Sequence, residues 1–123
     1  MPFASSINSK NLLTKFEQYT KLIDCENTIT QIEEIVDCIQ FFIKERPEYG
    51  IYNACNPGSI TTRKIIDLLG IEKQWITEKE FLEYSSTKRS NCNLNVSKLN
   101  AIYKLRPIED AVIETIRKYK EFR

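Results

Sequence analysis

The sequence predicts an α/β fold in a single domain over residues 1–123, rich in helix and with two to three short strands. Three observations lead to this fold class. Apolar residues recur at helical spacing in several segments, as they do in amphipathic helices. Short runs rich in β-branched and aromatic residues lie between these segments and are typical of strands. A chain of 123 residues can bury one modest core, so a second domain is not expected.

The first part of the chain is expected to hold a helix followed by β-capable sequence. Residues 8–21 carry apolar side chains at helical spacing: Leu12, Leu13, Phe16 and Tyr19. Asn8 or Ser9 is expected to cap this helix, because short polar side chains accept a hydrogen bond from the first turn. Residues 21–30 form a short segment that is compatible with a β-strand.

The clearest helix is predicted within residues 30–50. Its apolar residues form one stripe: Ile32, Ile35, Val36, Ile39, Phe42 and Ile43. Thr30 is the expected cap, with Glu33 three residues further on as in a capping box. Pro47 and Gly50 are expected to end the helix.

A strand is predicted at residues 50–55, followed by the turn Asn56-Pro57-Gly58 and a helix over residues 61–70 that Gly70 closes. A turn that leads into a helix can cradle a phosphate. Here, however, it has one glycine where a dinucleotide fingerprint needs three. We therefore expect Gly58 to supply a positive φ angle and Ser59 or Thr61 to cap the helix.

The last part of the chain is expected to end in two helices. Residues 73–82 hold a short strand, residues 83–95 are polar and loop-like, and helices follow over residues 96–105 and 108–122, with Pro107 at their junction. So few strands leave a sheet with uncovered edges, which suggests that part of a larger sheet lies outside this sequence.

Composition excludes several classes of function. Lys and Arg number 18 against 17 Asp and Glu, so no nucleic acid or membrane partner is expected. No apolar run is long enough to span a bilayer, and the first residues lack the features of a signal peptide, so a cytoplasmic location is expected. The chain has no histidine and no Cys-x-x-Cys pair, which argues against a metal site. Its four cysteines are interpreted as packing residues of a reducing compartment.

Four blocks of sequence carry a resemblance to a known family. In order they are MPFASSINSKNLLTKFEQY, NTIT, GIYNACNPGSITTRKII and RSNCNLNVSKL. They resemble the carboxy-terminal, substrate-binding part of extended short-chain dehydrogenase/reductases that act on nucleotide sugars. The resemblance is strongest to the bifunctional UDP-4-keto-6-deoxyglucose 3,5-epimerase/4-reductases of UDP-rhamnose synthesis. The dTDP-4-dehydrorhamnose reductases are further off.

The resemblance implies a substrate lobe with the late strands and helices of a Rossmann-type fold. Complete members have an amino-terminal half with a Gly-rich turn for NAD(P) and a Tyr-x-x-x-Lys pair. Gly50, Gly58 and Gly70 are too far apart for that turn. Tyr84 and Lys88 have the spacing of the pair but lie in loop-like sequence, so the match is interpreted as coincidence. We therefore expect a fragment that lacks the NAD(P)-binding half, binds no cofactor and is inactive alone, whereas the complete enzyme uses NADPH or NADH.

The substrate implied by the resemblance is a UDP- or dTDP-linked 4-keto-6-deoxyhexose, whose phosphates need hydrogen-bond donors. Asn11 is similar to an asparagine that contacts the diphosphate in related epimerases; the other interpretation is an exposed first-turn residue. Arg89 resembles an arginine that holds the diphosphate with its forked guanidinium, and its neighbour Lys88 is a weaker candidate. Asn27, in NTIT, falls where relatives place a polar or basic residue beside the nucleotide.

Lys15 is the candidate catalytic residue. A 3,5-epimerase removes a proton beside a ketone and returns one on the other face, which takes two groups. Without histidine, a Cys–Lys pair is one solution, with the cysteine in the part of the fold outside this sequence. Lys15 follows Asn11 by four residues and is expected on the same helix face. A solvated helix lysine is the alternative interpretation.

Three functions stay open on the sequence alone. The first is the substrate-binding part of an NADPH-dependent 3,5-epimerase/4-reductase. The second is a non-catalytic nucleotide-sugar-binding or interaction module that has lost the dehydrogenase half. The third is an unrelated helical scaffold. The sequence also leaves open whether the chain forms a homodimer.

Overall fold

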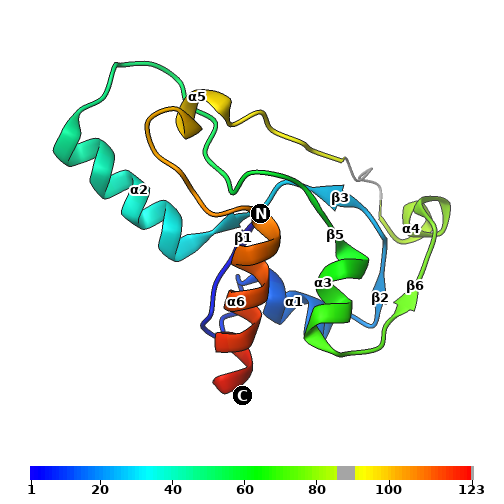
Figure 1. The fold of residues 1–123 in the computed structure, drawn as a ribbon. Helices are drawn as coiled ribbons and strands as arrows, with labels where there is room; N and C mark the ends of the chain where they lie inside the picture. Colours follow the sequence, from blue (N-terminus) through cyan, green and yellow to red (C-terminus); the bar gives the residue numbers. More distant parts are fainter. Residues whose placement is uncertain (86–90, 123) are drawn as a thin grey trace.

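The structure is a computed structural model and describes residues 1–85 and 91–122 (Figure 1). Its helices are α1 (Leu12–Gln18), α2 (Ile32–Glu45), α3 (Thr62–Leu69), α4 (Glu78–Tyr84), α5 (Ser97–Asn100) and α6 (Ile108–Glu121). Its strands are β1 (Pro2–Phe3), β2 (Lys21–Leu22), β3 (Glu26–Asn27), β4 (Thr30–Gln31), β5 (Ile60–Thr61) and β6 (Gln74–Trp75). The fold is α/β and rich in helix, which confirms the coarse fold class.

The strands are shorter and more numerous than expected. The described residues hold six strands of 2 residues each, in three separate two-stranded sheets. β1 pairs with β4 and β2 with β6 in parallel, whereas β3 pairs with β5 antiparallel. Each strand has a single neighbour, so the pairs join distant segments instead of building one layered sheet.

The strand predicted at residues 50–55 is wrong. Residues 51–54 adopt no strand, and no segment of the described chain pairs with them. Side chains contact this stretch instead: Lys98 Nζ donates to the carbonyl of Ile51 at 2.9 Å, and Thr30 donates to that of Ala54 at 3.5 Å. The sequence has strand propensity here, but a strand forms only where a neighbour completes the hydrogen-bond ladder.

The larger core lies where α1, α3 and α6 meet β1, β2 and β5. Its fully buried residues include Phe3, Leu13, Ile66, Val112 and Tyr119. Tyr119 also carries a polar contact into this core. Its hydroxyl lies 3.0 Å from the hydroxyl of Thr14 and donates to a carboxylate oxygen of Glu17 at 2.7 Å. The hydroxyl is thus satisfied although the ring is buried, as a buried tyrosine requires.

A second, smaller core lies under α2, which Figure 1 shows at the margin of the molecule, away from α1 and α3. Cys38 is buried there with Leu99 and Leu105, and Ile35 and Phe42 pack against them. The predicted single apolar stripe of α2 is therefore divided. Two of its six residues, Ile35 and Phe42, pack on this core, and the other four are exposed: Ile32, Val36, Ile39 and Ile43.

The turn before α3 has the structure that the sequence predicts. Gly58 has a φ angle of +92°, and the side chain of Thr61 accepts a hydrogen bond from Lys64 N at 3.2 Å. Gly70 closes α3 in the left-handed conformation with φ +71°. The short strand expected within residues 73–82 is also present, as β6.

Two other caps differ from the prediction. Asn11 caps α1 instead of Asn8 or Ser9. Gln31 caps α2 instead of Thr30, because its side chain accepts from Glu34 N at 2.7 Å while the Thr30 hydroxyl turns to another segment. Glutamine is an uncommon cap, so the residue preferences on which the sequence argument depends pointed to the threonine.

Further differences concern the end of the chain. Residues 83–84 end α4 and are not part of a loop, and α5 is shorter than the helix predicted over residues 96–105. Among the described helices, none has both the length and the apolar character that crossing a bilayer requires.

Candidate functional site

Asn11, a predicted phosphate contact, is 3% exposed and joins the segment after β1 to the start of α1. Its side-chain oxygen accepts from the backbone of Ala4 at 3.2 Å and of Leu13 at 3.1 Å. Its side-chain nitrogen donates to the carbonyls of Ala4 and Ser6, both at 2.7 Å. Asn11 is thus a buried cap and not the exposed residue of the alternative interpretation. Its contact with a substrate stays a prediction.

Lys15, the candidate catalytic residue, is exposed on α1, and no ion pair joins it to a described residue. The structure does not bring it to the same face as Asn11, whose side chain is buried. The reason is that Asn11 has the extended backbone of a cap, with φ −72° and ψ 130°, so the i, i+4 rule does not apply to it. A catalytic role for Lys15 stays a prediction.

Asn27 lies in β3 and binds the segment that begins at residue 91. Its side-chain oxygen accepts from Cys92 N at 2.8 Å, and its nitrogen donates to Cys25 Sγ at 3.3 Å. The neighbouring Glu26 N donates to the side chain of Asn91 at 3.1 Å, and Thr28 N donates to Cys92 O at 2.7 Å. These bonds hold residues 91–92 beside β3.

Lys88 and Arg89 lie outside the described residues. In the sequence, Arg89 comes two residues before Asn91, where the contacts with β3 begin. The predicted roles of Lys88 and Arg89 in binding a substrate stay predictions.

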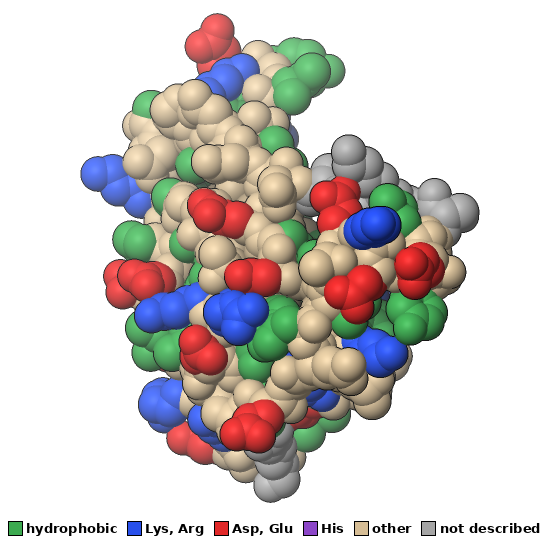
Figure 2. Space-filling model, turned by 90° about the vertical axis from the view of Figure 1, so that its right-hand side faces the viewer, with side chains coloured by type: hydrophobic (Ala, Val, Ile, Leu, Met, Phe, Trp, Pro, Cys, Tyr) green, Lys and Arg blue, Asp and Glu red, His purple; other side chains and the backbone are tan. Residues whose placement is uncertain are grey.

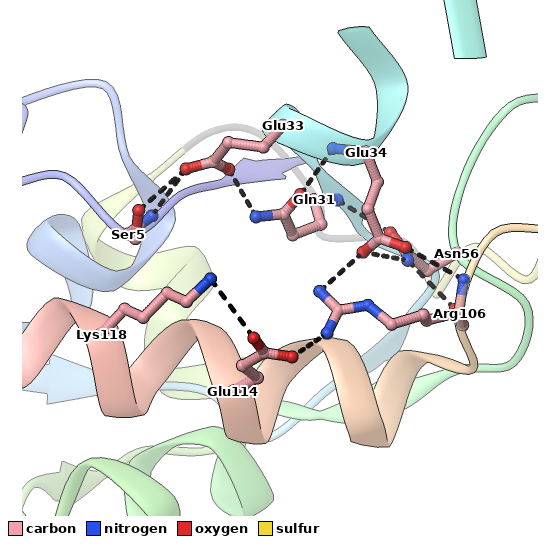
Figure 3. A network of polar contacts seen from close by, with 8 residues as sticks. All are labelled: Ser5, Gln31, Glu33, Glu34, Asn56, Arg106, Glu114 and Lys118. Atoms are coloured by element: carbon pink, nitrogen blue, oxygen red, sulfur yellow. Dashed lines mark hydrogen bonds and ion pairs between the residues drawn. The ribbon is translucent and has the colours of Figure 1, made fainter. Parts of the chain in front are cut away.

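A polar pocket of about 350 Å³ lies between the start of α2 and α6 (Figure 3). Arg106 is at its centre and bonds two carboxylates: Glu34 at 3.2 Å and Glu114, which also pairs with Lys118 at 3.2 Å. On the opposite side of the pocket, Glu33 accepts from the hydroxyl of Ser5 at 2.8 Å. The pocket therefore joins α2, α6 and the segment after β1.

Two carboxylates of this pocket, Glu33 and Glu114, are held in their charged form. Burial would raise the pKa of Glu33, but hydrogen bonds from its own backbone, from Ser5 and from Gln31 outweigh burial, so the pKa is lowered. Lys118 and then Arg106 lower the pKa of Glu114. A general acid at neutral pH needs a raised pKa. These two groups can accept hydrogen bonds or pair with cations, but they are not tuned to donate a proton.

The sequence argument missed this network. Asn56, from the Asn-Pro-Gly turn, is fully buried and donates to Glu34 at 3.1 Å and to the carbonyl of Arg106 at 3.0 Å. Its side-chain oxygen accepts from Gln31 N at 2.8 Å. The available signal in the sequence was a polar residue directly before a proline at two places, Asn56-Pro57 and Arg106-Pro107. Nothing in their spacing showed that the two turns meet.

The cysteines divide into buried and accessible thiols. Cys38 and Cys55 are buried, and burial raises the pKa of both thiols, so they stay protonated and behave as packing residues. Cys25 is half-buried and Cys92 is exposed. No group of three potential metal ligands occurs among the residues that the structure describes.

The Asn-Pro-Gly turn does not fit a dinucleotide. A Cβ atom added at Gly58 would lie 3.3 Å from a methyl group of Ile108, so this glycine faces the core and not an open phosphate cradle. Ile108 N donates to Pro57 O at 2.9 Å and closes the turn against α6. Within residues 1–85 and 91–122 the glycines thus supply no pyrophosphate site. On the face drawn in Figure 2, basic and acidic side chains are interspersed, without a region of one sign.

No protein-family model matches the chain. Among curated proteins, it is 28% identical over 126 aligned residues to a trifunctional UDP-glucose 4,6-dehydratase/UDP-4-keto-6-deoxy-D-glucose 3,5-epimerase/UDP-4-keto-L-rhamnose-reductase of Arabidopsis thaliana. That match covers 97% of this chain and 18% of the plant protein. It is 29% identical over 124 residues to a bifunctional dTDP-4-dehydrorhamnose 3,5-epimerase/dTDP-4-dehydrorhamnose reductase of the same plant, covering 94% of this chain and 41% of that protein.

Two crystal structures share the fold. A UDP-rhamnose synthase from Acanthamoeba polyphaga mimivirus superposes with a TM-score of 0.89 at 22% identity, over 96% of this chain and 43% of that one. A dTDP-4-dehydrorhamnose reductase from Yersinia enterocolitica superposes with a TM-score of 0.68 at 15% identity, over 91% of this chain and 44% of that one. The fold is therefore that of one part of a nucleotide-sugar reductase.

More particularly, the chain is homologous to the carboxy-terminal part of the rhamnose-forming epimerase/reductases. The resemblance recognised in the sequence is confirmed, and an unrelated helical scaffold is excluded. The chain spans less than half the length of these relatives, with 41% for the bifunctional enzyme and 43% for the viral structure.

Proposed function

We propose that this chain is the substrate-binding part of a cytoplasmic, NADPH-dependent 3,5-epimerase/4-reductase that converts UDP-4-keto-6-deoxyglucose to UDP-rhamnose. One observation carries the proposal. The similarity extends over 94% to 97% of the chain in the plant enzymes and over 96% in the viral structure, and the names of these proteins agree on rhamnose formation. The cofactor would bind to a nucleotide-binding part of the Rossmann-type short-chain dehydrogenase/reductase fold, because the glycines of this chain do not fit one.

The proposed substrate contacts centre on Lys88 and Arg89, which come shortly before residues 91–92, the segment that bonds to β3. Arg89 and Lys88 supply positive charge for the two phosphates, and a forked guanidinium matches two phosphate oxygens better than an ammonium group does. Asn27 fixes the following residues through its bond to Cys92 N at 2.8 Å. We assign Asn27 a positioning role, because its side-chain oxygen and nitrogen are already bonded within the chain.

Asn11 and Lys15 belong to the same proposal in different ways. The four bonds of Asn11 hold residues 4–11 as a defined loop before α1, so a diphosphate contact would need one of these bonds to be exchanged. Lys15 is exposed one turn further along and is the group proposed to move a proton beside the keto carbon. Epimerisation takes a second group, which the proposal places outside this chain.

Titration calorimetry on the 123-residue chain tests the proposal. UDP-rhamnose is expected to bind and NADPH is not, and comparison with dTDP-rhamnose identifies the nucleotide. The control ligand is ADP-glucose, which has the diphosphate and a sugar but a different base. Equal binding of all three sugar nucleotides would show only a phosphate site. Binding of none of them would remove the substrate-binding assignment.

The second candidate is a nucleotide-sugar-binding module without catalysis. Such a module needs no proton donor, and the lowered pKa values of Glu33 and Glu114 mean that these two pocket residues do not supply one. Adding a nucleotide-binding part of a rhamnose-forming relative and NADPH distinguishes the two. Oxidation of NADPH that depends on the keto sugar supports the enzyme, and its absence despite sugar-nucleotide binding supports the module.

A further inference from the structure

Residues 91–94 run beside residues 26–28, in the same direction, without forming a strand with them. In a parallel ladder, the N–H and the carbonyl of one residue both bond the neighbouring strand. Thr28 makes the first of these bonds, because its N–H donates to Cys92 O at 2.7 Å. For the second, Leu94 N donates to the Thr28 hydroxyl at 3.5 Å and not to its carbonyl. The hydroxyl also donates to Cys92 O at 3.3 Å, so it completes the pairing in place of the carbonyl.

Side chains also supply the other bonds between these two stretches. Glu26 N donates to Asn91 Oδ1 at 3.1 Å, and Cys92 N donates to Asn27 Oδ1 at 2.8 Å. One backbone-to-backbone bond therefore joins the two stretches, together with four bonds that use a side chain. A backbone ladder forms with almost any side chains, since every residue except proline carries the same donor and acceptor. This attachment instead depends on which side chains are present, so a single substitution can release it.

Thr28 is the residue on which most of this attachment depends. It takes part in three of the five bonds, two of them through its hydroxyl. The residue is 7% exposed, and the buried thiol of Cys55 is a further hydrogen-bond partner of the hydroxyl, so the side chain is held in place. Residues 91–94, in contrast, are exposed. Packing contributes little to holding exposed residues, so the hydrogen bonds determine their position.

We propose that Thr28 is a positioning residue for nucleotide-sugar binding, because its hydroxyl fixes residues 91–94 beside β3. This inference rests on the proposed function, in which Lys88 and Arg89 supply the charge for the two phosphates. Arg89 comes two residues before Asn91, so the position of residues 91–94 limits where its side chain can reach. A charged hydrogen bond to phosphate needs a close and directed approach, and a displaced anchor weakens it. Thr28 itself contacts no substrate in this proposal.

Amide hydrogen exchange of the 123-residue chain, followed residue by residue by NMR, tests the attachment. Thr28→Val keeps the shape of the side chain but removes the hydroxyl, so exchange at Cys92 N and Leu94 N should become about threefold to tenfold faster. Thr28→Ser keeps the hydroxyl and should restore most of the native protection. The matched control is Thr30→Val, which removes a hydroxyl that donates to Ala54 O at 3.5 Å and should leave both amides unchanged. Native exchange in α3 and α6 would show that the larger core is intact in each variant.

Titration calorimetry with UDP-rhamnose tests the consequence for binding. Thr28→Val should bind about threefold to tenfold more weakly, whereas Thr28→Ser and Thr30→Val should bind like the native chain. Unchanged exchange at Cys92 and Leu94 in Thr28→Val overturns the attachment. Faster exchange with native affinity, or an equal loss of affinity in Thr30→Val, overturns the positioning role. A native chain that binds no UDP-rhamnose overturns the proposed function and the positioning role with it, while the exchange measurement still decides whether the hydroxyl fixes residues 91–94.

Discussion

Replacing Asn11 by alanine should lower the free energy of unfolding of the chain, and not only weaken its binding of a ligand. The side chain makes four hydrogen bonds, two accepted from Ala4 N and Leu13 N and two donated to Ala4 O and Ser6 O. Loss of a cap costs about 1 kcal/mol, and each buried group left unpaired costs about 1–3 kcal/mol. Because water can reach some of the freed groups, we expect a loss of about 2–4 kcal/mol in the free energy of unfolding.

Urea unfolding followed by circular dichroism measures this loss. Asn8→Ala is the control, because Asn8 is exposed and its side chain accepts one bond, from Lys10 N at 2.9 Å. Its loss should stay below about 1 kcal/mol. Asn11→Asp keeps the acceptor but removes both donated bonds and buries a charge, so it should be at least as harmful as alanine. An Asn11→Ala variant as stable as the native chain would refute the reasoning and return Asn11 to a purely ligand-binding role.

Three further outcomes are expected. The free energy of unfolding should fall as the pH drops below the ordinary glutamate pKa of 4.5. The pKa values of Glu33 and Glu114 are lowered in the folded state, so these groups stabilise it only while they are charged. In urea titrations at several pH values, Glu114→Gln should make this fall smaller. Arg89→Ala should weaken UDP-rhamnose binding by about tenfold to a hundredfold in calorimetry, with Arg89→Lys recovering part and the exposed Arg63→Ala as an unchanged control. NADPH added to the chain should give no binding heat, and micromolar affinity would contradict the interpretation of the Gly58 turn.

The elements that the sequence predicted well are those determined by local chemistry. Thr61, Gly58 and Gly70 fix the start, the preceding turn and the end of α3 through interactions within a few residues, and all three have the predicted roles. The same holds for α6, which follows Pro107 with its apolar period intact. Local propensity is enough where the partners of each backbone group lie in the same segment.

The elements that were predicted wrongly depend on partners far away in the sequence. Residues 51–54 have strand-like composition but no neighbouring strand within the described chain. The stripe of α2 was read as one face, although the helix has a covered and an uncovered side. The helical spacing of apolar residues shows which side of a helix is apolar, but it does not show how many neighbouring surfaces pack against that side.

In the candidate site, too, the sequence indicates the types of residue but not the distant residues that they contact. By resemblance, the sequence placed Asn27 beside the nucleotide, and that role stays a prediction. The bond between its side chain and Cys92 N was not predicted. The Arg106 network was not predicted, because its members come from separate segments: the start of α2, the Asn-Pro-Gly turn, the residue before Pro107, and α6. Ionic networks assembled by tertiary structure become visible only when the fold is known.

The Asn-Pro-Gly turn shows how a segment that looks like a ligand site can instead join two cores. Gly58 packs against Ile108 at the start of α6, which belongs to the larger core. Asn56, two residues earlier, bonds Gln31 at the start of α2 and the carbonyl of Arg106. A phosphate in this turn would need the same backbone and side-chain donors that these contacts already use. The glycine is required because α6 approaches closely, and the asparagine because its buried side chain bonds three polar groups, Gln31 N, the Glu34 carboxylate and the Arg106 carbonyl.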